Sequence, residues 1–130
     1  MACLDTNFLS AMIKKDANAK QKLQSLRKRR LSVSTTIINI AELYYGAYNS
    51  QRKSQNLADL QMIINTLNIL ELDNVSAERY GILAADPSIK ASPVGAFDLL
   101  IASIAIVNNE PVVTQDGDFN NIPNLNVESW

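Results

Sequence analysis

Short apolar runs alternate with longer helical stretches along this chain, and this alternation limits its fold more than any other feature. Five runs have the composition of strands, and they are MACLD (1–5), LSVST (31–35), NILELD (68–73), PVVT (111–114) and LNVES (125–129). Strands that alternate with helices favour a mainly parallel sheet covered on both faces. The sequence therefore predicts an α/β protein with three α/β/α layers, a mainly parallel sheet of four to five strands, and one domain over residues 1–130.

Six helices are expected between these strands. They cover about residues 7–15, a stretch opened by Asp16 or Asn18, the residues after Thr35 or Thr36, and the ranges 51–66, 75–85 and 97–108. In the third helix, the predicted buried stripe consists of Ile38, Ala41, Tyr45 and Tyr48. The sixth helix is apolar on nearly every side and is predicted to be fully buried. Residues 87–95 are predicted to form a loop.

The composition narrows the chemistry that this chain can perform. The 130 residues include no histidine and one cysteine, so an enzyme of this composition depends on acidic residues and a metal rather than on imidazole or thiolate. Cys3 has no partner for a disulfide within the chain, which favours a reducing compartment. The longest apolar run has nine residues, whereas a membrane helix needs roughly 20. We expect a soluble, cytoplasmic protein with no membrane association.

Charge is divided unevenly between the two halves of the chain. Residues 1–53 contain ten Lys and Arg against three Asp and Glu, whereas residues 54–130 contain two against ten. A basic half attracts phosphates and an acidic half holds cations. The ordinary alternative is that the lysines and arginines between residues 14 and 30 only solvate helix surfaces.

Acidic residues stand beside several of the predicted core segments. Asp5 ends the first strand, Glu42 lies within the third helix, Asp98 opens the sixth helix, and Asp116 and Asp118 follow the fourth strand. Taken singly, most have an ordinary explanation: Asp5 and Asp98 as helix caps, and the last two as turn residues. Glu42 is harder to explain, because a mid-helix position beside an apolar stripe neither caps nor is readily solvated.

The ligand requirement of a divalent metal ion explains all of these positions together. Ligands of open α/β sheets bind beyond the carboxyl ends of the strands, which is where these acids are predicted to meet. Clustered carboxylates repel one another unless a cation is present, and Mg²⁺ and Mn²⁺ prefer carboxylate oxygens. Such ions support phosphodiester hydrolysis without histidine or cysteine. The pattern favours a metal-dependent site.

Five segments together resemble the PIN-domain ribonucleases, in particular the VapC toxins of bacterial toxin-antitoxin pairs. They are LDTN, STTIINIAELYYGA, FDLLIASIA, VVTQDGDF and IPNLNVESW, and their order and spacing cover nearly the whole chain. The resemblance implies a PIN fold and endoribonuclease activity with Mg²⁺ or Mn²⁺. It also implies an RNA substrate, neutralisation by a VapB-type antitoxin, and a homodimer.

The resemblance also assigns roles to individual residues. The catalytic and metal-binding acids that it implies are Asp5, Glu42, Asp98 and Asp116. It implies supporting roles for Thr6, Asn7 and Thr114, each of which is equally explained as a cap or a strand-end hydroxyl.

The chain departs from many relatives in two places. Only Gly117 separates Asp116 from Asp118, where many relatives carry two residues, so either acid could complete the site. We favour Asp116 as the ligand and Asp118 as a helper, because Asp116 is nearer the strand end. The arginine that many relatives carry before the third acid is also missing after Arg79, which leaves substrate positioning to the basic half.

Two other interpretations follow from different features. A catalytically weak or silent PIN-fold interaction module would act through its antitoxin or another partner, using apolar residues such as Tyr44, Met62 and Ile63, although core packing is the simpler interpretation of these three. A phosphoryl-accepting receiver domain needs an adjacent acidic pair near the first strand and a lysine after the last one, and neither is present. The chain also has no G-x-G-x-x-G motif and no P-loop.

Overall fold

The computed structural model describes residues 1–130 and contains a sheet of five parallel strands. The strands are β1 (Ala2–Leu4), β2 (Val33–Thr36), β3 (Asn68–Leu70), β4 (Val112–Val113) and β5 (Val127–Glu128). They lie in the order β3-β2-β1-β4-β5, and every neighbouring pair is parallel. The predicted α/β fold with a parallel sheet is confirmed, with five strands.

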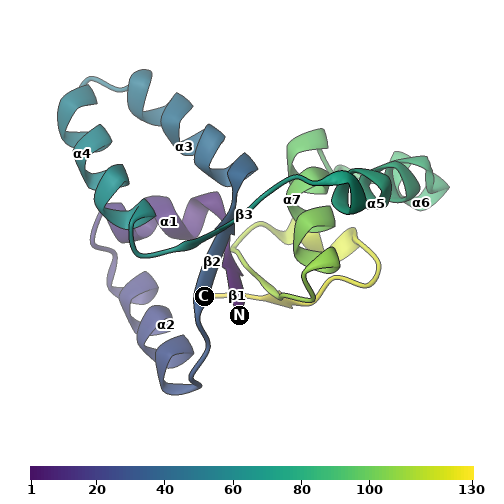
Figure 1. Ribbon diagram of the computed structural model, residues 1–130, viewed down its shortest axis with the longest axis horizontal. Helices are drawn as coiled ribbons and strands as arrows, with labels where there is room; N and C mark the ends of the chain where they lie inside the picture. Colours follow the sequence, from purple (N-terminus) through teal and green to yellow (C-terminus); the bar gives the residue numbers. More distant parts are fainter.

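Helices cover both faces of this sheet (Figure 1). They are α1 (Thr6–Ile13), α2 (Ala17–Lys28), α3 (Ile37–Tyr48), α4 (Lys53–Ile64), α5 (Asn74–Ala85), α6 (Pro87–Lys90) and α7 (Ala96–Val107), with a 3₁₀ helix at Gly117–Asn121. Figure 1 shows α1 to α4 on one side of the strands and α5 to α7 on the other. None of these helices is long and apolar enough to cross a membrane.

Two hydrophobic cores lie between the three layers. Successive residues of a strand point to opposite faces of the sheet, so Leu4 and Val113 enter the core beneath α1 to α4, whereas Cys3 and Val112 enter the core beneath α7. The central part of α7 supplies fully buried side chains, including Ile101 and Ile104. These cores hold the carboxyl ends of β1 and β4 in fixed positions beside each other.

The chain's end is joined to the helices on the first face. The rings of Phe8 and Trp130 pack edge to face with centroids 5.2 Å apart. Glu128 forms ion pairs with Arg29 at 2.9 Å and with Lys22 at 3.3 Å. Strand β5 is therefore held against both α1 and α2.

The predicted buried stripe of α3 was wrong in three of its four residues, since only Ile38 packs against a core, the one beneath α7. Tyr45 is 71% exposed and Tyr48 is 59% exposed, and Ala41 is also exposed. The buried face consists instead of Asn39, Ile40, Leu43 and Ala47. The helix is rotated from the prediction because the amide of Asn39 is bonded inside the protein and therefore takes a core position.

Several local predictions also need correction. Residues 87–95 are not all loop, since Asp86 caps the short helix α6 and Pro87 occupies its first turn. The first turn of α7 is not buried, because Phe97 is 59% exposed. Met62 was assigned to the core on the simpler interpretation, yet 70% of it is exposed. Tyr44 and Ile63 do pack against the core beneath α1 to α4.

Candidate active site

The strand order places the acidic residues around one end of the sheet. The chain moves outward from β1 to β2 and β3, and then returns to the other side of β1 with β4 and β5. The switch point therefore lies between β1 and β4, whose carboxyl ends lead into Asp5 and Thr114. Helices α1 and α3 begin directly after β1 and β2, so their amino-terminal turns face the same place.

Asp5 is the most deeply buried acid of the group, with 5% of its surface exposed. It occupies the N-cap position of α1 but makes no side-chain capping bond, so the capping explanation does not hold. Its two carboxylate oxygens instead accept hydrogen bonds from Asn39 at 3.0 Å and Thr114 at 2.7 Å. Burial raises the pKa of Asp5, and these hydrogen bonds oppose the rise. The side chain is fixed in one orientation.

Asn39 connects three parts of the site and was not identified from the sequence. Its amide nitrogen donates to Asp5 and to the Thr6 hydroxyl, both at 3.0 Å. Its amide oxygen accepts from the backbone N–H of Thr36 at 3.2 Å and from the Thr36 hydroxyl at 2.7 Å. The T-x-x-N spacing of a capping box was the available signal, since Asn39 is the third residue of α3 after the cap Thr36.

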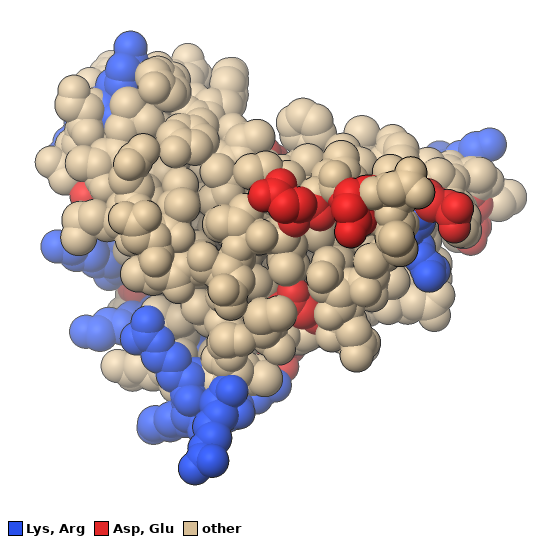
Figure 2. Space-filling model, viewed as in Figure 1, with Lys and Arg blue, Asp and Glu red and all other residues tan.

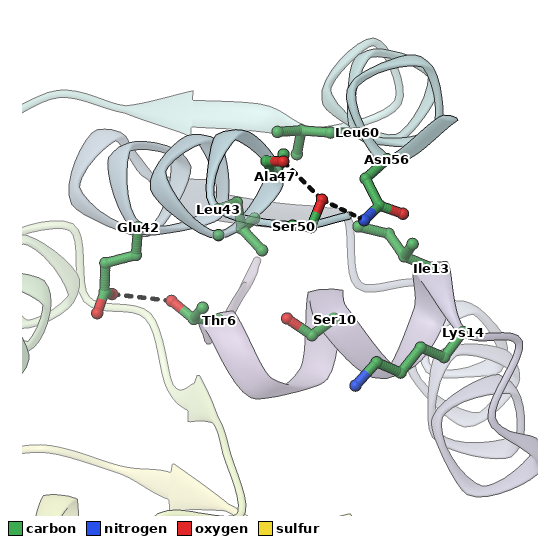
Figure 3. Close-up of a pocket in the computed structure, with 11 residues that line it drawn as sticks. Thr6, Ser10, Ile13, Lys14, Glu42, Leu43, Ala47, Ser50, Asn56 and Leu60 are labelled. Atoms are coloured by element: carbon green, nitrogen blue, oxygen red, sulfur yellow. Dashed lines mark hydrogen bonds between the residues drawn. The ribbon is translucent and has the colours of Figure 1, made fainter. Parts of the chain in front are cut away.

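Thr6 and Glu42 form the next part of the site, on α1 and α3. The Thr6 hydroxyl donates to the Glu42 carboxylate at 2.9 Å, a contact drawn in Figure 3. Glu42 is half-buried, and its pKa is raised first by burial and then by the charge of Asp5. Thr6 therefore accepts from Asn39 and donates to Glu42, which orients both carboxylates.

Thr114 and Asn7 support the opposite side of Asp5. Thr114 donates to Asp5 and accepts from the Asn7 amide at 3.1 Å and from the backbone N–H of Asp116 at 3.0 Å. The resemblance implied supporting roles for both residues, and the structure shows them hydrogen-bonded to each other. Thr114 is nearly fully buried, so its hydroxyl serves as a fixed link between β1 and the segment after β4.

Asp98 faces the other acids from the first turn of α7. No capping bond involves it, because the N-cap of α7 is Gly95. Burial is the main cause that raises the pKa of Asp98 to about 6, followed by the charges of Asp5, Asp116, Glu42 and Asp118. Asp98 therefore lies close enough to the other four carboxylates for the charge of each to act on it.

Asp116 and Asp118 lie beside each other after β4. Asp116 caps the 3₁₀ helix, because its carboxylate accepts the backbone N–H of Asp118 at 2.9 Å. The turn explanation is therefore correct for Asp116, but it occupies only one of that carboxylate's two oxygens. Asp116 also contributes to the raised pKa of Asp5, whereas Asp118 is not among the causes.

The donor set suits a hydrated hard cation better than a tightly enclosed one. No three of the acids converge closely enough to ligate one ion directly. Mg²⁺ keeps several of its waters and is usually held through only one or two carboxylates. Burial is the first cause that raises the pKa of Asp5, Glu42 and Asp98, and a cation bound beside them would lower all three pKa values.

Comparisons with known proteins identify the family of this chain. The family model described as PIN domain matches residues 2–125. The chain is 34% identical to Ribonuclease VapC2 of Rickettsia felis and 33% identical to the tRNA(fMet)-specific endonuclease VapC of Salmonella typhimurium. Each alignment covers 98% of this chain and 96% of the relative.

Solved structures give the same result. The structure of VapBC2 from Rickettsia felis bound to a promoter DNA fragment contains a chain that matches with a TM-score of 0.90 at 34% identity, covering 99% of this chain and 98% of that one. A chain of DNA-bound VapBC from Salmonella typhimurium matches with a TM-score of 0.87 at 31% identity, covering 100% and 99%. The chain belongs to the PIN-domain family, as a VapC-type member.

Proposed function

We propose that this protein is a Mg²⁺- or Mn²⁺-dependent endoribonuclease in which Asp5, Glu42, Asp98 and Asp116 hold one or two metal ions, directly or through the waters that the ions keep. Ribonuclease chemistry is the activity named for its VapC relatives. The observation that supports metal dependence is the position of Asp98, whose pKa is raised by burial and by four surrounding carboxylates. Such a cluster is costly when nothing neutralises it, and it gains stability when a cation binds.

The surrounding residues have distinct tasks in this proposal. A bound divalent cation stabilises negative charge on a phosphodiester and lowers the pKa of a coordinated water. Asn39 and Thr114 keep Asp5 in one orientation, and Thr6 does the same for Glu42. One carboxylate oxygen of Asp116 accepts the backbone N–H of Asp118, and the other is free to bind the metal. We assign Asp118 a helping role because this hydrogen bond orients Asp116.

The substrate that we propose is RNA. A relative at 33% identity is named a tRNA(fMet)-specific endonuclease, so an initiator transfer RNA is the first substrate to test. Figure 2 shows Lys and Arg gathered over α2, away from most of the acidic side chains. Of this basic group, Lys22 and Arg29 pair with Glu128, and the others remain available to attract phosphate.

RNA cleavage with Mg²⁺, with Mn²⁺ and with EDTA tests the proposal. We expect product only with a metal, and a loss of at least 100-fold in the Asp5→Asn and Asp98→Asn variants, because each removes a proposed ligand. Asp86→Asn is the matched control, since Asp86 is the cap of α6 and lies outside the site. Full metal-dependent cleavage by either site variant would contradict the assignment. Absence of cleavage under all conditions would favour a silent interaction module.

We also propose that the protein binds a VapB-type antitoxin and forms a homodimer. The similar chains from Rickettsia felis and Salmonella typhimurium belong to VapBC complexes. Large apolar side chains of α5 and α7 remain exposed in this chain, among them Val75, Ile82 and Phe97. Light scattering of the isolated protein tests the dimer, and a monomer at micromolar concentration would contradict it.

A further inference from the structure

A groove of about 430 Å³ leads away from the acidic site between α1, α3 and α4 (Figure 3). Thr6 and Glu42 lie at one end and Lys14 lies at the other. The groove is lined by Thr6, Ser10, Ile13, Lys14, Glu42, Leu43 and neighbouring residues of α3 and α4. Because Thr6 and Glu42 belong to the acidic site, a molecule that occupies the groove also reaches that site.

One wall of the groove is a polar strip on α1, which we define as Thr6, Ser10 and Lys14. These residues are four positions apart, so they lie on the same side of the helix. Thr6 is bonded to Glu42, whereas no interaction in Figure 3 reaches Ser10 or Lys14. Both ion pairs of the protein involve Glu128, so the exposed ammonium group of Lys14 has no carboxylate partner.

The opposite wall combines apolar and polar atoms. Leu43 and Ala47 of α3 and Leu60 of α4 line it with the small exposed part of each side chain, beside Ser50 and Asn56, which are hydrogen-bonded to each other at 2.9 Å. A molecule that fits both walls carries negative charge along one edge and, along the other, flat groups that both pack and form hydrogen bonds. A single RNA strand has this pattern, with phosphates on one edge and bases on the other.

The length of the strip relates Lys14 to the site of cleavage. Thr6 and Lys14 are eight residues apart, which corresponds to about 12 Å along a helix. A strand whose scissile phosphodiester lies at the acidic site therefore brings one of its next few phosphates to Lys14.

We propose that this groove is a subsite for the RNA strand beside the scissile bond, and that Lys14 binds a backbone phosphate there. This inference rests on the proposed ribonuclease function. A protein segment is the other class of molecule that a groove of this size accommodates. The continuity of the groove with the acidic residues favours RNA, because a strand bound for cleavage must leave the site along some path, and this groove begins at Glu42.

Binding measurements on a matched pair of variants test the subsite. All proteins carry Asp98→Asn so that the RNA stays intact, and the probe is a fluorescein-labelled single-stranded RNA of 12 nucleotides. Lys14→Gln removes the proposed contact, Lys14→Arg retains its charge, and Lys90→Gln removes an exposed charge from α6. Fluorescence anisotropy between 0.05 and 0.3 M salt gives the dissociation constant and its salt dependence.

We expect Lys14→Gln to lower the slope of log K against log salt by about 0.7, the value for one phosphate contact on a single strand, and to weaken binding about five-fold at 0.1 M salt. Lys14→Arg and Lys90→Gln should bind as the parent does. Equal binding by Lys14→Gln and Lys90→Gln would refute the subsite. If Lys14→Gln kept its RNA affinity but lost affinity for the proposed VapB-type antitoxin, the groove would be a protein site and the proposal would fail.

The cleavage assay separates this inference from the proposed function. In proteins with Asp98 intact, Lys14→Gln should raise KM for RNA about five-fold and leave kcat unchanged, since Lys14 is a positioning residue distant from the reacting bond. A protein that cleaves RNA normally after Lys14→Gln retains its proposed function and contradicts only the subsite. A parent protein that cleaves no RNA contradicts the function itself, whatever the binding data show.

Discussion

Neutralising Asp98 should make this protein more stable while it removes activity. The carboxyl of Asp98 has its pKa raised from an ordinary value near 3.8 to about 6, first by burial and then by the four neighbouring acids. At pH 7 the group is therefore charged in a position that disfavours charge. Asp98→Asn keeps the shape of the side chain and removes the charge, so in EDTA the folded state of the variant should be favoured.

The size of the gain follows from the same pKa. At 1.36 kcal/mol per pKa unit, the shift would correspond to about 3 kcal/mol for a carboxyl shielded from water. Asp98 is only half-buried, and screening by solvent reduces this to about 1 kcal/mol. With a urea dependence of about 2 kcal/mol per molar, the unfolding midpoint should rise by about 0.5 M. Fluorescence of Trp130, which packs against Phe8, reports the transition.

The pH dependence gives the prediction a definite sign. A raised pKa means that the folded protein binds the Asp98 proton more tightly than the unfolded chain does, so the free energy of unfolding of the parent should fall as pH rises from about 4 to about 6. The advantage of Asp98→Asn should therefore be absent near pH 3.8 and complete above about pH 6. Asp73→Asn is a control of opposite sign, because hydrogen bonds from Ser76 lower the pKa of Asp73. A midpoint for Asp98→Asn at pH 7 that is unchanged or lower, with the same urea slope, would refute the reasoning.

Further predictions concern the other parts of the site. Asn39→Ala should cost about 3 kcal/mol in urea unfolding, because it leaves the buried Asp5 carboxylate without one donor. Addition of 10 mM MgCl₂ should raise the thermal midpoint of the parent and leave that of Asp98→Asn nearly unchanged, as differential scanning fluorimetry would show. Asp116→Asn should reduce the rate of RNA cleavage more than Asp118→Asn does, and the reverse order would exchange their roles. Ile104→Ala should cost about 2–5 kcal/mol in urea unfolding, with cleavage per folded molecule retained, because Ile104 is buried in α7 away from the site.

Much of the fold could be predicted because local signals agreed with the long-range packing. The five strands are short apolar runs bounded by polar residues, and the helices between them have capping residues such as Asp16 and Asp73. The positions of Asp5 and Asp98 beside predicted strands and helices placed them near one end of the sheet, and the structure brings them together there.

The hydrogen-bond network that orients the acids could not be predicted, and the reason is physical. Asn39 is polar, so hydropathy predicts that it lies on the surface. The predicted buried stripe of α3 therefore included Tyr45 and Tyr48 instead. Asn39 is buried because its amide donates to Asp5 and Thr6 and accepts from Thr36. Asp5 and Thr6 lie more than 30 residues away in the sequence, whereas Thr36 is the N-cap of the same helix. A satisfied buried amide and a solvated one look identical in a sequence, because the difference lies in partners that only the folded chain brings within reach. The side of α3 that faces the core is therefore determined by the active-site network as well as by hydrophobicity, and a substitution at Asn39 should disturb both packing and catalysis.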